Sequence, residues 1–360
     1  EKLNSNGIGS KLTIWSNNNI FYKENFVNKG FLSSTSPGLF FGLDELKVID
    51  SLQVQWPSGK SQKLYSVKTN LNLILFEKDA KVINSISNKE NKSIFSDYTD
   101  KVVPQIFHQE NIFNDFNREP LIPYMLSKEG PAVAVADINS DGYEDIYIGS
   151  SSFNKSRIFM GRKNDRYDIA HHSDIYEDSI SEDVDAIFFD ADNDNDLDLY
   201  VVSGGNEFPL KFKSIQDRLY ILNDKGHYIR DTFSLPIIYQ NGSIVRSSDF
   251  DNDGDLDLFV AGRVIPGQYG LSPKHYLLEN NGKGKFVVNK QNSFENLGMV
   301  TDAVWVDIDN DGWKDLFLSG DWSEIKFYKN SLGVFKDESK KYNLNKKGWW
   351  FSIHSADINN

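Results

Sequence analysis

The chain has 360 residues, of which 13% are aromatic, and a formal net charge of −13. Its length allows a large core and two domains, and its acidic balance excludes nucleic acid and anionic membranes as expected partners. The lack of cysteine excludes disulfides, and no apolar run is long enough to predict a transmembrane segment in this chain.

The first eighty residues show the alternation of apolar and polar side chains that is typical of strands. We predict strands within residues 11–15, 47–60, 63–67 and 71–77. The tetrapeptide Trp56-Pro57-Ser58-Gly59 predicts a turn that closes a hairpin. Residues 1–80 are therefore expected to form a small all-β domain.

Residues 81–129 differ in composition from what precedes and follows them. Their first part is polar, and the second part is rich in Phe, Asn and Pro without a clear period. We predict a connector followed by an ordered strap that packs against the next domain.

From residue 130 onward an aspartate-rich nonapeptide recurs four times, and a fifth copy begins at Asp357. The complete copies cover residues 137–145, 190–198, 249–257 and 307–315. Positions 1, 3, 5 and 9 of each copy carry oxygen-bearing side chains, which are the ligands that a hard divalent cation prefers. Position 6 is Gly, or Asn195 in the second copy, and both residues tolerate the positive φ of a tight loop.

The flanks of these nonapeptides distinguish them from the EF-hand. An EF-hand loop ends in a bidentate Glu at position 12 and lies between helices. Here position 12 is apolar in every copy, and short β-branched and aromatic runs precede and follow the loop. We therefore place each loop between two strands. An acidic turn without a metal is the alternative for any one copy, but four copies favour cation binding.

The spacing of the copies predicts a repeat architecture. Their first aspartates stand at residues 137, 190, 249, 307 and 357, and a hairpin signature lies between successive loops, within residues 157–167, 218–228, 275–286 and 325–335. A period of this length with several strands per unit predicts propeller blades.

This unit of loop and hairpin resembles the FG-GAP/VCBS repeat, the blade of the calcium-binding propellers of integrin α subunits and of many bacterial surface proteins. The resemblance covers residues 130–360. The segments NSNGIGSKLTIW (4–15), GFLSSTSPGLFFGLDE (30–45) and VQWPSGK (54–60) resemble the ASPIC/UnbV domain. The resemblance implies an all-β protein in which an ASPIC/UnbV-like domain precedes an incomplete β-propeller of four to five blades.

The resemblance also implies one Ca²⁺ per complete loop, and thus about four sites. The ligands carried over to this sequence are Asp137, Asn139, Asp141 and Asp145; Asp190, Asp192, Asp194 and Asp198; Asp249, Asp251, Asp253 and Asp257; and Asp307, Asp309, Asp311 and Asp315. The backbone carbonyl of position 7 can add a ligand, from Tyr143, Asp196, Asp255 or Trp313. Asn139 replaces an acid and lowers the ligand charge of the first loop.

Crowded carboxylates without a cation repel one another, so we expect the fold to depend on the metal. Loops with the affinity of extracellular calcium modules need millimolar calcium, so we expect a protein of the cell exterior, at the bacterial outer surface or in the periplasm. Because a propeller closes only with complete blades, we also expect the natural protein to continue beyond residue 360 and to carry another propeller before residue 1.

The favoured function is a non-catalytic surface module that binds a protein or a glycan, since the sequence contains no catalytic constellation. The alternative is part of a secreted carbohydrate-active enzyme with its site on the propeller face. Two long inserts, residues 203–213 and 262–276, are the candidate binding surface for either function, with hydrogen-bonding and stacking groups on Asn206, Glu207, Lys213, Arg263 and Tyr269.

Overall fold

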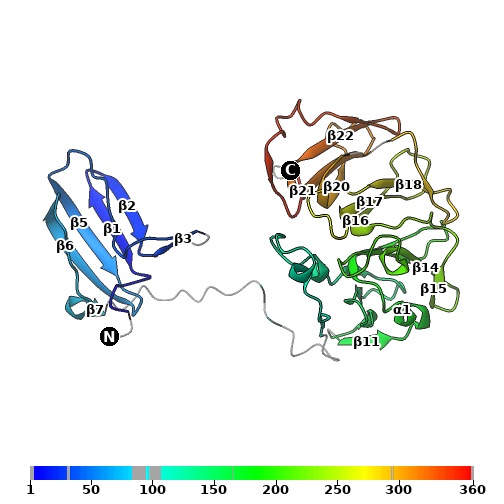
Figure 1. The fold of residues 1–360 in the computed structure, drawn as a ribbon, viewed down its shortest axis with the longest axis horizontal. Coiled ribbons are helices and arrows are strands. Elements are labelled where there is room, and N and C mark those ends of the chain that lie inside the picture. Colours follow the sequence, from blue (N-terminus) through cyan, green and yellow to red (C-terminus); the bar gives the residue numbers. More distant parts are fainter. Residues whose placement is uncertain are drawn as a thin grey trace. The chain divides into compact units, whose positions relative to one another are not determined.

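The computed structural model describes residues 4–30, 33–82, 95, 97, 107–164, 166–292, 294 and 296–357. The chain forms two compact units, residues 1–96 and residues 97–360 (Figure 1). The polar part of the predicted connector and the last three residues of the fifth nonapeptide lie largely or wholly outside the described residues.

The first unit is built on one antiparallel sheet with the strand order β2-β1-β5-β6-β7. Its strands are β1 (Lys11–Ser16), β2 (Asn19–Glu24), β5 (Val48–Gln55), β6 (Lys60–Lys68) and β7 (Lys81–Val82). A short hairpin, β3 (Asn28–Gly30) and β4 (Ser33–Ser34), and a 3-10 turn, η1 (Glu77–Asp79), complete the unit. Ile14, Ile49 and Leu52 are buried at its core.

Local turn chemistry explains the hairpins of this sheet. Asn17 and Asn18 both have positive φ (48° and 63°) between the paired residues Ser16 and Asn19, which is the geometry of a two-residue turn that matches strand twist. The predicted turn at Trp56–Gly59 is confirmed by the bond from Gly59 N to Trp56 O (2.9 Å).

The prediction of a strand over residues 71–77 is wrong. Asn70 has a φ of 56° and turns the chain away from the line of β6. Leu71, Leu73 and Ile74 are exposed, and β7 pairs with β6 instead. An apolar run becomes a strand only where a neighbouring strand offers its hydrogen bonds, and here the chain does not return to one.

The second unit contains four antiparallel sheets in chain order, each with four consecutive strands and the first strand at one edge (Figure 1). The first two sheets consist of β8 (Val133–Ala136), β9 (Asp145–Ile148), β10 (Arg157–Arg162) and β11 (Arg166–Ala170), and of β12 (Asp183–Phe189), β13 (Asp198–Ser203), β14 (Arg218–Leu222) and β15 (Tyr228–Asp231). The last two consist of β16 (Asn241–Ser248), β17 (Asp257–Val264), β18 (Tyr276–Glu279) and β19 (Val287–Val288), and of β20 (Met299–Val306), β21 (Asp315–Glu324), β22 (Lys326–Ser331) and β23 (Val334–Asp337).

The sheets are the blades of an all-β propeller, because the first strand of each sheet contacts the first strand of the next: β8 contacts β12, β12 contacts β16, and β16 contacts β20. In the second strand of a blade, successive side chains point to opposite faces of the sheet. Each face packs against a different neighbouring blade. Leu199 and Val201 of β13 pack with the first blade, whereas Tyr200 and Val202 pack with the third. This explains why β13 reads as an uninterrupted apolar run: it is buried on both faces.

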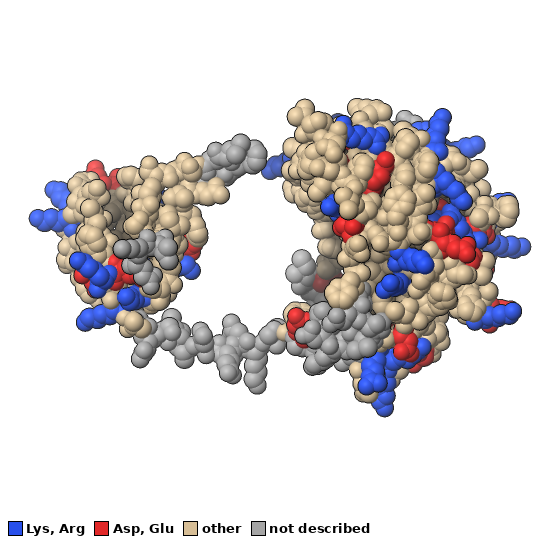
Figure 2. All heavy atoms as spheres, turned by 60° about the horizontal axis from the view of Figure 1, so that its bottom comes forward, with Lys and Arg blue, Asp and Glu red and all other residues tan. Residues whose placement is uncertain are grey.

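Short elements complete the second unit. They are η3 (Asp115–Asn117), η4 (Leu126–Lys128), the helix α1 (Ser173–Glu177), η5 (Lys213–Ile215) and β24 (Lys347–Trp349), which pairs with β21. On the face of this unit that Figure 2 shows, acidic and basic side chains are interspersed.

The segment of residues 107–129, called the strap below, lies against the blades. Asp115 accepts a 2.9 Å bond from Nδ2 of Asn206, and Glu119 accepts one of 2.9 Å from the backbone N–H of Tyr269. Glu129 accepts a 2.8 Å bond from Nε of Arg263. These bonds tie the strap to the second and third blades, and the bonds from Ser151 Oγ to Gln109 O (2.6 Å) and from Tyr124 OH to Asp321 (2.6 Å) tie it to the first and fourth.

Candidate metal centres

Each aspartate-rich nonapeptide joins the first and second strands of one blade. Position 1 follows β8, β12, β16 or β20, and position 9 is the first residue of β9, β13, β17 or β21. Because both ends of the loop are fixed in the sheet, its oxygen-bearing side chains lie close together at one end of the blade.

Position 1 organises the backbone of all four loops. Its carboxylate accepts the N–H groups of positions 5 and 6, as in the bonds to Asp249 from Asp253 N (3.1 Å) and Gly254 N (3.1 Å). The same pair of bonds recurs at Asp137, Asp190 and Asp307. The loop is therefore folded by its own backbone donors, which leave the remaining carboxylate lone pairs available to a cation.

Position 9 has a role that the nonapeptide pattern did not reveal. Asp257 is 1% exposed, and its two oxygens accept bonds from Phe250 N (3.4 Å) and from Asn280 N (2.8 Å), the residue directly after the third strand. The same arrangement holds for Asp145, Asp198 and Asp315. This aspartate thus connects the loop to the neighbouring hairpin. Burial raises the pKa of Asp198 to about 7 and that of Asp257 to about 8.

Two residues of each loop have left-handed backbone conformation, whereas the sequence predicted one. Position 6 has a φ of 85°, 72°, 96° and 87° in the four loops. Position 4 also has positive φ, at Ser140, Asn193, Asn252 and Asn310. The asparagines at position 4 were the sequence signal for this conformation, since Asn tolerates it better than most residues.

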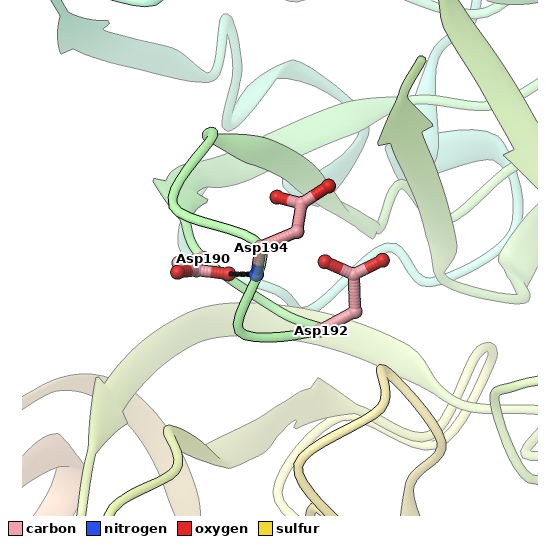
Figure 3. A group of neighbouring side chains, drawn as sticks. All are labelled: Asp190, Asp192 and Asp194. Carbon is pink, nitrogen blue, oxygen red and sulfur yellow. Dashed lines mark hydrogen bonds between the residues drawn. The ribbon is translucent and has the colours of Figure 1, made fainter. Parts of the chain in front are cut away.

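Carboxylates gather in three of the four loops. Oxygens of three aspartates lie within 4.8 Å of one another in the second, third and fourth loops, and such a group could hold a metal ion. The groups are Asp190, Asp192 and Asp194 (Figure 3); Asp249, Asp251 and Asp257; and Asp307, Asp309 and Asp311. Within the described residues, the first loop forms no such group, and Asn139 occupies its third position.

The second and third loops have buried oxygens that no hydrogen bond satisfies. In the described part of the chain, Oδ1 of Asp192 and Asp196 and Oδ1 of Asp251 and Asp255 are buried without a partner. Burial first, and then the neighbouring carboxylates, raise the pKa of Asp196 and of Asp255 to about 6. Buried oxygen atoms of this kind require compensation, and a hard divalent cation supplies it. The residues of these two loops therefore fit Ca²⁺.

Basic side chains reach into the first and fourth loops. Nη1 of Arg162 lies 3.1 Å from Oδ2 of Asp141 in the first loop. Lys329 contacts three carboxylates of the fourth loop. Its bond to Asp311 lowers the pKa of that carboxyl group.

The predicted face residues are only partly accessible. Asn206 is 0% and Arg263 3% exposed, because the strap covers them through the bonds described above. Their burial therefore argues against the prediction that these two side chains offer groups to a ligand. Lys213 is exposed, and Glu207 and Tyr269 are partly exposed.

The structure instead reveals an aromatic surface that the sequence analysis did not single out. The rings of Trp322 and Trp349 stack with centroids 4.8 Å apart, and Phe351 stacks on Trp349 at 5.9 Å. Trp322 is 57% and Phe351 61% exposed. Nε1 of Trp322 also donates a 3.1 Å bond to the hydroxyl of Tyr269, in one of the two predicted inserts.

Among the described residues, no helix has the length and apolar character needed to cross a membrane.

Family comparisons match both parts of the chain. Residues 1–82 match the ASPIC and UnbV family, residues 249–318 and 307–360 match the FG-GAP-like repeat, and residues 130–165 match the FG-GAP repeat. No curated protein sequence matches the chain.

Many solved structures resemble part of the chain, among them the following two. One is a proposed exo-beta-1,3-galactanase from Bifidobacterium bifidum s17, with 11% identity and a TM-score of 0.34 over 57% of this chain and 70% of that one. The other is the V. cholerae biofilm matrix protein Bap1, with 17% identity and a TM-score of 0.31 over 59% of this chain and 30% of that one. TM-scores this low support no inference about the present chain.

Proposed function

The chain carries FG-GAP repeats behind an N-terminal ASPIC/UnbV domain, and from this premise we propose that it is a calcium-binding β-propeller module of the cell exterior. In this proposal the module binds a protein or a glycan and is not catalytic. Calcium bound in the loops stabilises the blades that present the binding surface.

One observation supports calcium binding above the others: the unsatisfied buried carboxylate oxygens of the second and third loops. Each of these loops contains five aspartates, at positions 1, 3, 5, 7 and 9. An all-oxygen ligand set in an irregular loop suits Ca²⁺, whereas Mg²⁺ demands a near-ideal octahedron and retains its waters. The repeats match the FG-GAP families, and an exterior location is part of the proposal because loops with the affinity of extracellular modules would fill only at millimolar calcium.

The aromatic surface supports the binding part of the proposal. Exposed, stacked indole and phenyl rings present flat apolar faces, which pack against protein side chains or sugar rings and supply a large contact area. Trp322, Trp349 and Phe351 form such a surface beside Tyr269.

Calcium titration of the metal-free chain by calorimetry tests the first part of the proposal. We expect CaCl₂ to bind, and we expect Asp192→Asn and Asp251→Asn each to weaken or remove one site. Asp224→Asn is the control, because Asp224 is exposed, lies between β14 and β15 and is outside the nonapeptides. The proposal fails if the wild-type chain binds no calcium, or if the three variants and the wild type titrate alike.

The binding surface is tested separately, with the calcium-loaded chain on arrays of glycans and of surface proteins. Trp322→Ala should lose any ligand that the wild type retains, and Phe233→Ala, another exposed aromatic, should keep it. Retention by both variants would place the binding surface elsewhere.

The enzyme alternative would use Glu182 and Glu207, two acidic side chains that both lie against Gly205. Burial raises the pKa of Glu182 to about 8 and also raises that of Glu207. Glu182 is 1% exposed, so a polysaccharide could not reach it without rearrangement of the residues around it. Depletion of a polysaccharide by the chain, lost in Glu207→Gln, would favour this alternative.

A further inference from the structure

The fourth loop contains a cation that belongs to the chain itself. Nζ of Lys329 lies 2.6 Å from Oδ1 of Asp309, 2.8 Å from Oδ2 of Asp311 and 3.3 Å from Oδ1 of Asp315. These carboxylates belong to positions 3, 5 and 9 of the nonapeptide. The side chain of Lys329 is 15% exposed, whereas its partners Asp309 and Asp311 are exposed and Asp315 is buried. The lysine therefore lies along the loop with its ammonium group directed at these carboxylates.

The register of the blades shows which residues occupy this place elsewhere. Backbone N–H groups of Gly161, Leu222, Asn280 and Asn330 bond to the position-9 aspartates of the four loops. These four residues are therefore equivalent, and so are the residues that precede them. The equivalents of Lys329 are Met160 in the first blade, Ile221 in the second and Glu279 in the third.

The loops differ in how their acids are compensated. The second and third loops have an apolar or an acidic residue at the equivalent place, and both contain buried carboxylate oxygens without partners. In the fourth loop, none of the described carboxylate oxygens is buried and unpartnered. The first loop also has none, and there Arg162 of the third strand pairs with Asp141. The two loops that a basic side chain of their own third strand enters are thus the two described loops without an unsatisfied buried acid.

An ammonium group and Ca²⁺ cannot share this set of carboxylates. Both would lie within hydrogen-bonding distance of Asp309 and Asp311, and two like charges at such separation repel strongly. To admit Ca²⁺, Lys329 would have to leave three carboxylates that now satisfy its three N–H donors.

We propose that Lys329 takes the place of the metal ion in the fourth loop, so that the second and third blades depend on calcium while the fourth does not. The inference rests on the proposed calcium function, since it specifies which of the repeats use the ion. Its consequence is a propeller whose fourth loop stays folded when calcium is scarce.

Calorimetric titration with CaCl₂ of the full chain tests this assignment. Lys329→Met introduces the residue that the first blade has at this place. The variant protein should bind one more Ca²⁺ per chain than the wild type. Lys326→Met is the matched control: it removes the same charge from the same strand, but Lys326 pairs with Glu324 and Asp337 outside the loop. Its stoichiometry should equal that of the wild type.

Two further variants locate the ion. Asp309→Asn in the wild-type background should leave the number of bound Ca²⁺ unchanged, whereas adding Asp309→Asn to Lys329→Met should abolish the extra site. A lower stoichiometry for Asp309→Asn alone would show that the fourth loop already binds calcium, and the inference would be overturned although the proposed function stands.

The thermal midpoint gives a second readout. Lys329→Met should melt at a lower temperature than the wild type in EDTA and recover in CaCl₂, while Lys326→Met should show neither change. Failure of Lys329→Met to gain a site while it remains folded overturns the inference. A wild type that binds no calcium, together with a gain in Lys329→Met, would refute the proposed function alone.

Discussion

The side-chain amide of Asn280 donates a 2.8 Å hydrogen bond to the main-chain oxygen of Ala191, so the third blade holds the loop of the second. The same amide group bonds to Leu256 O in its own blade at 3.1 Å. Asn330 repeats the pattern one blade later, with bonds to Phe250 O (2.8 Å) and Lys314 O (3.0 Å). Neighbouring nonapeptide loops are therefore coupled by buried asparagines.

Replacing Asn280 by leucine, the residue at the equivalent place in the second blade, should destabilise the propeller by at least about 2 kcal/mol. The change leaves two buried carbonyl groups without this donor, and each unsatisfied group costs on the order of 1–3 kcal/mol. Urea unfolding at fixed calcium measures the effect. Gln291→Leu, an exposed position of the same blade, should change stability by less than about 0.5 kcal/mol. Equal stability of the two variants would argue against the coupling.

The buried pair of Arg218 and Asp183 should be essential to the first two blades. Both side chains are almost fully buried, and Asp183 also accepts bonds from Tyr147 OH (2.7 Å) and Ser150 N (3.2 Å). Arg218→Met leaves an uncompensated buried charge, so we expect a loss of about 3–5 kcal/mol. The double variant with Asp183→Asn should recover part of that loss. A loss below about 1 kcal/mol, as at exposed pairs, would contradict the assignment.

The free energy of unfolding should decrease as pH rises, because of the buried carboxyl group of Glu182. Burial, which is the largest cause, raises the pKa of its carboxyl group from 4.5 to about 8. The folded chain then holds a proton that the unfolded chain releases, so this contribution to stability is fully present below pH 4.5 and is lost as pH rises through about 8.

Glu182→Gln, which keeps an oxygen acceptor for Ser152 N, should remove that dependence. Relative to the variant, the wild type should lose on the order of 2–4 kcal/mol between pH 5 and pH 8. Melts at saturating calcium measure the difference between the two proteins. Parallel stability profiles would show that Glu182 is ionised in the folded state.

Asn195 offers a test of the loop backbone. It has a φ of 72° where the other loops have glycine. Asn195→Gly should therefore be neutral or stabilising by up to about 1 kcal/mol, whereas Asn195→Ala should be destabilising by about 1 kcal/mol. Thermal melts in EDTA separate this backbone effect from metal binding. A more stable alanine variant would contradict the left-handed conformation.

The features that sequence predicted well are those encoded within a few residues. The nonapeptide fixes its own turn through Asp, Asn and Gly, and the flanking apolar runs define the strands β8, β12 and β20 around it. The blades follow because this local unit repeats.

The features that sequence missed depend on residues far apart in the chain. Lys329 reaches the fourth loop from β22, and no pattern within the loop predicts this contact. Arg263 was expected on a binding face but is covered by the strap through Glu129. The run at residues 71–77 had strand composition, yet it is not placed beside another strand.

The most direct test of the account is the thermal midpoint of the wild-type chain in EDTA, in millimolar CaCl₂ and in millimolar MgCl₂. An ion that binds only the folded state raises stability by RT ln(1 + [L]/Kd) for each site. We predict that the midpoint rises progressively with calcium concentration and much less with magnesium. An unchanged midpoint in calcium would mean that the nonapeptides are acidic turns without a metal, which would contradict the central claim.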